Sequence, residues 1–192
     1  MAQEISGVVT LNLEQTTQQL TSLGEQLRVG NFTGSGKLRG GIRGDIENVF
    51  GWQGKSSPET PLTDQDRVTW LEKFREEATA GKEATGAPSS LVNWIDGRIE
   101  EIKETEVEKW MKARSQNPQP INNESVQTLL DQFELAGREY GEIETRRFED
   151  THPMMVGRGK SYSPEDEARM RELSVQRKNI KIGLYDILFK RE

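Results

Sequence analysis

The sequence predicts a mainly α-helical protein, with a small N-terminal α/β piece up to about residue 54 followed by a bundle of about four helices. Residues 5–13 predict a half-buried strand, because residues 9–13 alternate apolar and polar side chains. Beyond residue 62, apolar side chains recur every three or four positions, which is the spacing of one helix face. Only 32% of the residues are hydrophobic and 30% are charged. That composition is typical of an elongated helical bundle, or of a subunit that buries surface against partners.

The N-terminal piece begins with the predicted strand, whose buried face would carry Val9, Leu11 and Leu13. Residues 14–27 carry leucines at positions 20, 23 and 27, which could form a short amphipathic helix that Gly24 weakens. A loop at residues 30–36 then leads into a helix that should start near Lys37 or Leu38.

Residues 55–62 contain two prolines and two serines and predict a linker, so that we expect domains at residues 1–54 and 63–192. Each later helix has a start signal of the kind that satisfies free backbone N–H groups. Ser163 followed by Pro164 and two acids is the strongest of these signals. The expected capping residues are Thr63, Ser89 or Ser90, Asn122 or Asn123, and Ser163.

Whole-chain composition restricts the chemistry and the location. The chain has 192 residues, no cysteine, one histidine and a formal net charge of −6. Disulfides and thiolate metal sites are therefore excluded, and a cytoplasmic location is the simplest interpretation. No segment approaches the roughly 20 consecutive apolar residues of a membrane span, so we expect no membrane partner.

A glycine-rich basic segment at residues 33–51 is the most informative stretch for function. Five glycines lie within eleven residues, at positions 34, 36, 40, 41 and 44. Glycines let a backbone approach a ligand closely, and cations beside them favour a phosphate chain. Arg39 and Arg43 are four apart and would share one helix face. The alternative, a surface loop feeding an ordinary helix, has about equal support from the residues alone.

Enzymatic chemistry finds no support in the sequence. The segment lacks the G-x-x-x-x-G-K-[ST] pattern of a nucleotide P-loop, since Leu38 follows Lys37. His152 is the only histidine, so a histidine triad or a multi-histidine zinc site lacks material. We therefore expect no enzyme, no metal and no cofactor. Trp52 is the tryptophan best placed to stack on a base, because it follows the basic segment.

The segment resembles the glycine-rich signature of the RAMP superfamily, the RNA-binding subunits of CRISPR effector complexes. Residues 38–43 (Leu-Arg-Gly-Gly-Ile-Arg) fit that signature position by position, and Glu47 and Phe50-Gly51 fit its continuation. The resemblance implies that residues 8–13 are the first strand of a partial ferredoxin-like fold. It assigns contact with RNA backbone to Ser35, Lys37, Arg39 and Arg43, and the position of Trp52 adds that side chain to the predicted RNA-binding set.

The same resemblance implies a non-catalytic, type III-like CRISPR subunit in antiviral defence. RAMP subunits that cut RNA place an aspartate before the signature, and residues 14–36 contain none. The later helices resemble the small helical-bundle subunit of such complexes. The implied partners are guide RNA, with the target strand as a second candidate, and neighbouring protein subunits. Such a ribonucleoprotein complex binds RNA largely without sequence preference.

The alternative is a structural or scaffolding component of a phage or virion assembly that has no nucleic-acid role. The acidic body, the amphipathic helices and the missing catalytic constellation all suit such a component. The two hypotheses differ in one measurable property, which is whether nucleic acid accompanies the purified protein.

Overall fold

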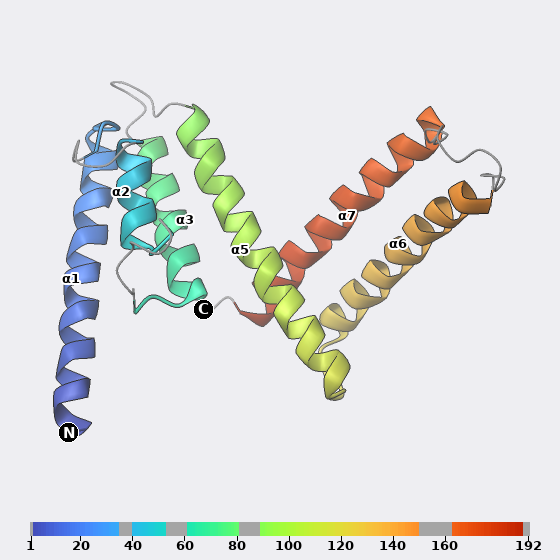
Figure 1. Ribbon diagram of the computed structural model, residues 1–192, viewed down its shortest axis with the longest axis horizontal. Helices are drawn as coiled ribbons and strands as arrows, with labels where there is room; N and C mark the ends of the chain where they lie inside the picture. The colour runs from blue at the N-terminus through green and yellow to red at the C-terminus, as the bar shows by residue number, and fades with distance from the viewer. Residues whose placement is uncertain (1, 35–39, 53–60, 81–88, 150–162, 190–192) are drawn as a thin grey trace. The chain divides into compact units, whose positions relative to one another are not determined.

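The computed structural model describes residues 2–34, 40–52, 61–80, 89–149 and 163–189. Within these residues the chain forms six helices and no strand (Figure 1). In chain order the helices are α1 (Ala2–Arg28), α2 (Ile42–Val49), α3 (Asp64–Ala80), α5 (Ser89–Gln116), α6 (Glu124–Glu149) and α7 (Pro164–Leu188). The prediction of a mainly helical protein, with four helices after residue 62, is confirmed.

The prediction of an N-terminal α/β, ferredoxin-like piece is wrong, because residues 5–13 lie within helix α1. A short apolar alternation fits a helix as well as a strand, so it is a weak signal. The residues after position 13 decide the structure: Leu20, Leu23 and Leu27 repeat at helical spacing and are buried. The short helix expected at residues 14–27 is therefore the C-terminal half of a longer one.

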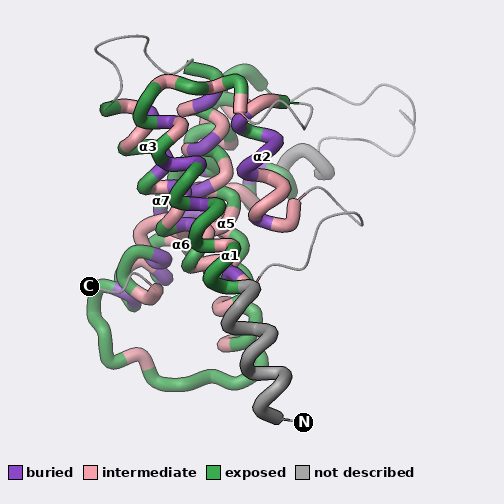
Figure 2. Tube along the Cα trace, turned by 90° about the vertical axis from the view of Figure 1, so that its left-hand side faces the viewer, coloured by how far each residue is buried: buried purple, intermediate pink, exposed green. Residues whose placement is uncertain are grey.

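The chain divides into two compact units, Met1–Ile102 and Lys103–Glu192. In the first unit, α1 packs against α2 and α3. The centre of this packing is Phe74, which stacks on Phe50 with ring centroids 6.3 Å apart and faces Gly24 of α1. Figure 2 shows the buried positions along these helices. They include Leu20, Leu23, Leu27, Ile42, Ile46, Phe50, Val68, Leu71, Phe74 and Ala78.

Three of the predicted capping residues, Thr63, Asn123 and Ser163, are confirmed by their hydrogen bonds, whereas Ser89 and Ser90 lie within the first turn of α5. The Thr63 hydroxyl accepts from the backbone N–H of Asp66 at 3.1 Å, and the Asp66 carboxylate accepts from the Thr63 N–H at 2.9 Å. This reciprocal pair satisfies two N–H groups that the helix itself leaves free. The Asn123 side chain caps α6, and the Ser163 hydroxyl caps α7 by accepting from the Asp166 N–H at 3.0 Å.

The second unit contains an antiparallel pair formed by α6 and α7. Leu129, near the start of α6, lies beside Gly183, near the end of α7. Further along α6, Glu139 binds Arg169, which lies near the start of α7. Both oxygens of Glu139 accept from Arg169, at 2.6 and 2.8 Å, and this pair, with Glu172, raises the pKa of the guanidinium. The small core between the two helices consists of Ala136, Ile143 and Leu173, with Tyr140 and Met170 packed against it.

Helix α5 belongs to both units, because the division falls between Ile102 and Lys103. The linker predicted at residues 55–62 lies almost wholly outside the described residues, so the predicted domain boundary stays a prediction. Among the helices that the structure describes, none combines the length and apolar character that crossing a membrane requires.

Candidate functional site

The glycine-rich turn between α1 and α2 is shaped by close contacts within the chain. Gly34 has φ of 66°, and a Cβ atom there would lie 2.6 Å from the backbone nitrogen of Ile42 and overlap the Asp45 carboxylate. A Cβ on Gly41, where φ is 61°, would lie 2.9 Å from the carbonyl oxygen of Phe32. Both positions need glycine for conformation and for space. The turn thus requires these two glycines whether or not a ligand is present.

Helix α2 begins at Ile42, later than the predicted start near Lys37 or Leu38. Gly40 and Gly41 have φ of 107° and 61°, which a right-handed helix does not contain. The helix that carries Arg43 therefore does not extend back past Gly41, and Arg39, which was expected to share its face, lies outside the described residues.

Asp45 lies in the first turn of α2 and is buried, with 8% of its surface exposed. The N-terminus of a helix attracts negative charge, because its free N–H groups and its dipole point there. Here a carboxylate of the chain itself, placed beside Gly34, already supplies that charge. The start of α2 is consequently a poor site for an additional phosphate.

Of the five predicted RNA-binding residues, the structure places two. Ser35, Lys37 and Arg39 lie outside the described residues. The Arg43 side chain is 52% exposed; its Nε donates to Glu47 Oε1 at 3.2 Å, and its guanidinium lies 4.9 Å from the centroid of the Trp94 ring. Trp52 is half-buried and meets Phe50 edge-on, with centroids 4.8 Å apart.

Two residues of α5 that the sequence did not single out for function complete this surface. The guanidinium of Arg98 lies 5.0 Å from the centroid of the Trp52 ring. The ring of Trp94 lies under the guanidinium of Arg43. Trp94 and Arg98 are four residues apart and therefore share one face of α5. We name the four side chains Arg43, Trp94, Arg98 and Trp52 the arginine–tryptophan face. The i, i+4 spacing on α5 was the available signal, but the partners on α2 and beyond it could not be read from the sequence.

Acidic side chains accompany four arginines of the first unit. An anionic polymer would compete with these carboxylates, although exposed ion pairs are each worth less than about 1 kcal/mol and yield readily. The pairs are Arg43 with Glu47, Arg67 with Asp64, Arg75 with Asp96, and Arg98 with Glu101. Each of these four arginines therefore has a carboxylate beside it.

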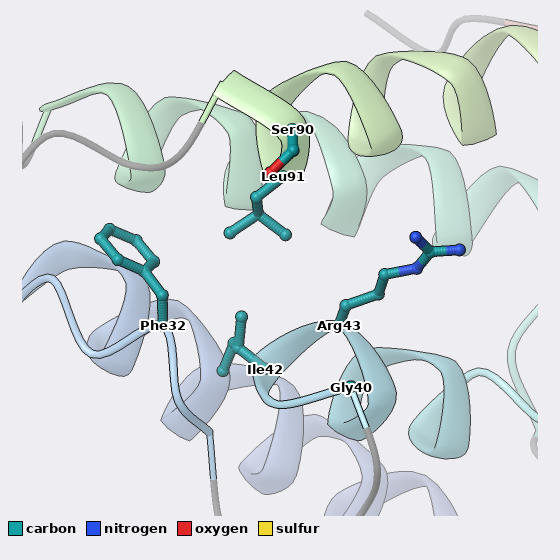
Figure 3. A pocket seen from close by; sticks show the side chains of 6 residues that line it. All are labelled: Phe32, Gly40, Ile42, Arg43, Ser90 and Leu91. Carbon is teal, nitrogen blue, oxygen red and sulfur yellow. The ribbon is translucent and has the colours of Figure 1, made fainter.

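A small apolar notch of about 210 Å³ lies next to the glycine-rich turn (Figure 3). Phe32, Ile42 and Leu91 point toward one another across it, whereas the Arg43 guanidinium points away from them. Ser90 lies at its upper edge, in the first turn of α5. The notch offers apolar contact but no converging set of charged groups.

No group of three or more His, Cys, Asp or Glu side chains gathers as a metal site would, as far as the described part of the chain reaches. His152 lies outside that part, and the absence of enzyme activity and of a cofactor stays an expectation. Comparisons with protein-family models, with curated proteins and with solved structures found no match to this chain.

Proposed function

We propose that this chain is a non-catalytic helical component of a larger protein assembly, of the structural or scaffolding kind, such as a phage or virion assembly. The observation that carries the proposal is the narrow buried stripe on α6 and α7. These helices have 26 and 25 residues, and a helix with one face in a core buries about three of every seven, or about eleven here. In the described part of the pair, each helix buries only four residues, which leaves much of its expected buried face for a partner to cover. They are Val126, Leu130, Ala136 and Ile143 on α6, and Leu173, Ile180, Leu184 and Tyr185 on α7.

Exposed apolar side chains on the same pair support contact with protein partners. Leu135 of α6 is 62% exposed and Val175 of α7 is 57% exposed. Val175 also lies beside Leu129 and Ile180 at a shallow groove between the two helices. Single exposed apolar residues are ordinary, but an apolar groove on a thin helix pair is the kind of surface that a partner helix covers.

A second candidate is the RNA-binding subunit of an RNA-guided CRISPR antiviral complex, which the sequence resemblance suggests. The arginine–tryptophan face favours it, because tryptophan rings and arginine planes are the groups on which single-stranded bases stack. The buried Asp45 and the paired carboxylates weaken it, since they occupy or balance the charges that a phosphate chain would use. We therefore place it second.

One experiment separates the two proposals. The tagged chain is purified from its native host with its partners, and the absorbance ratio at 260 and 280 nm is measured together with the protein composition of the complex. A stoichiometric protein complex with a protein-like absorbance ratio supports the assembly proposal. Co-purifying RNA supports the second candidate, and a chain that elutes alone, without protein or RNA, contradicts both.

A variant sharpens this experiment where RNA is found. Lys37→Glu, Arg39→Glu and Arg43→Glu together should abolish RNA retention and leave the helical circular-dichroism spectrum unchanged. The matched control tests for a non-specific effect of net charge by reversing three exposed cations of the second unit, at Lys112, Arg138 and Arg171. Equal RNA retention by the first variant and the unaltered chain would contradict the role assigned to the basic segment.

A further inference from the structure

The contact between the second half of α5 and α7, within the second unit, contains several ion pairs between long charged side chains. From residue 103 to residue 116, only Lys103 and Val107 are buried. Val107 is the one apolar side chain of that stretch with no exposed surface. One valine gives a small apolar contribution compared with the several leucines that join α1 to α3.

Among the described residues, four ion pairs join the two helices. Lys103 Nζ lies 2.8 Å from Asp186 Oδ1 and 5.4 Å from the centre of the Tyr185 ring. Lys181 of α7 lies between two carboxylates of α5: its Nζ is 3.5 Å from Glu104 Oε2, and it also pairs with Glu108. Lys178 adds a longer pair to Glu104, at 3.8 Å. We name these six charged side chains (Lys103, Glu104, Glu108, Lys178, Lys181 and Asp186) the ionic seam.

The contact between α6 and α7 contains an ion pair of this kind, Glu139 with Arg169, but also an apolar core. There the helices come close enough that a Cβ on Gly183 would lie 3.5 Å from a Leu129 methyl group. Ala136, Ile143 and Leu173 fill the space between them. Apolar contacts of this type do not weaken when salt is added, and salts such as sulfate strengthen them.

Three of the six members of the ionic seam are accessible to solvent ions, whereas Glu104 is 27%, Lys181 14% and Lys103 9% exposed. The Asp186 side chain is 41% exposed, that of Glu108 61% and that of Lys178 41%. Dissolved salt screens such charges, since the screening length falls from about 10 Å at 0.1 M to about 3 Å at 1 M. The seam should therefore weaken over a range of salt that leaves the α6–α7 contact intact.

We propose that the ionic seam is a latch that holds the α6–α7 pair against the second half of α5 and releases it when its charges are screened or neutralised. Release uncovers Val107 and Tyr185, which are 0% and 3% exposed in the closed arrangement. A charged partner that competes for Glu104, Glu108 or Lys181 would act as added salt does. The device controls access to an apolar strip, and it does not depend on which proposed function holds.

Because the chain contains no cysteine, two introduced cysteines carry spin labels at chosen positions only. Labels at Lys112→Cys on α5 and Gln176→Cys on α7 report the latch, and labels at Glu134→Cys and Gln176→Cys report the α6–α7 pair. The distance between the two labels is measured by double electron–electron resonance, from about 0.1 M to about 1 M sodium chloride. We expect the α5–α7 distance to lengthen and broaden with salt while the α6–α7 distance stays fixed.

A charge reversal tests the same latch without salt. Lys181→Glu places a third carboxylate beside Glu104 and Glu108, and should lengthen the α5–α7 distance at about 0.1 M salt. Adding Glu108→Lys restores an opposite-charge pair and should recover most of the short distance, which general loosening of α7 would not do. If the reversal abolishes helical structure, the salt series on the unaltered seam decides. An α5–α7 distance that ignores salt, or two distances that lengthen together, would overturn the proposal.

Discussion

The cluster around Phe74 in the first unit and the ionic seam in the second join helices by opposite means. Phe74 and Phe50 have no exposed surface and their rings stack on each other, with Phe74 facing α1 at Gly24. The seam instead joins α5 to α7 through the long side chains of Lys103 and its neighbours. Both regions come from helices with regular amphipathic spacing, so the pattern alone does not tell how firmly two helices are held. The identity of the side chains at the contact decides that.

Because of this difference, the two regions should respond differently to added salt. Burial of apolar surface is insensitive to ionic strength at moderate salt, and it stabilises by about 25 cal/mol for each Å² removed from water. Pairs of partly exposed charges contribute less and are screened. We therefore expect the first unit to resist salt and the α5–α7 contact of the second unit to respond to it.

The largest expected effect comes from removing the apolar centre of the first unit. Phe74→Ala should lower the free energy of unfolding by about 3–5 kcal/mol, because it leaves a cavity among Phe50, Trp70 and Gly24. Urea unfolding followed by circular dichroism measures the change. Glu76→Ala, on the exposed side of the same helix, is the control. A loss below about 1 kcal/mol would show that this cluster is not the centre of the unit.

A smaller effect is expected at the buried end of the ionic seam. Lys103→Ala should lower the free energy of unfolding by about 1–2 kcal/mol. The loss is smaller than for a fully buried ion pair, because Asp186 is partly exposed. Lys103→Met keeps the aliphatic stem and should be within about 1 kcal/mol of the unaltered chain. The alanine effect should shrink at high salt. If the Phe74→Ala effect shrank equally, the contrast between the two regions would fail.

The start of α7 separates local helix stability from the seam. Ser163→Ala removes the hydroxyl that accepts from the Asp166 N–H, and should cost about 1 kcal/mol. Ser163→Gly should cost only a few tenths. Thermal unfolding at two salt concentrations measures both variants. Because the cap is uncharged, its effect should be the same at each concentration; a strong salt dependence would be inconsistent with this assignment.

A small effect is also expected for the charged contact inside the first unit. A double-mutant cycle with Arg43→Ala and Trp94→Ala should give a coupling of about 0.5–1 kcal/mol, since the arginine is half exposed. Arg43→Lys is a useful third variant, because lysine lacks the flat guanidinium that lies over the ring. A coupling near zero would mean that the arginine–tryptophan face contributes nothing to joining α2 and α5.

Much of the fold can be predicted from the sequence because its signals are local. The caps at Thr63, Asn123 and Ser163 each depend on a residue and the N–H groups two or three positions later, so they can be read without tertiary information. The error at residues 5–13 has the opposite origin. Three alternating apolar residues carry no information about what lies beside them, and the helical continuation to Leu27 overrode them.

Less of the candidate site could be predicted from the sequence, for a similar reason. The glycines and cations of the basic segment are visible in the sequence, but the contacts of Gly34 with Asp45, and of Arg43 with Trp94, join residues 11 and 51 positions apart. No periodicity encodes such pairs. The sequence therefore identified an unusual turn, while the reason for its glycines came from the folded chain.

Gly34 has a consequence for anyone who ranks positions of this chain by tolerance to substitution. Any side chain there collides with Asp45 and Ile42 and must also adopt φ of 66°. A saturation scan would mark the position as invariant, and a family alignment would show the same column of glycine. Both results would look like the footprint of a bound molecule, although a turn folding onto its own helix produces them just as well.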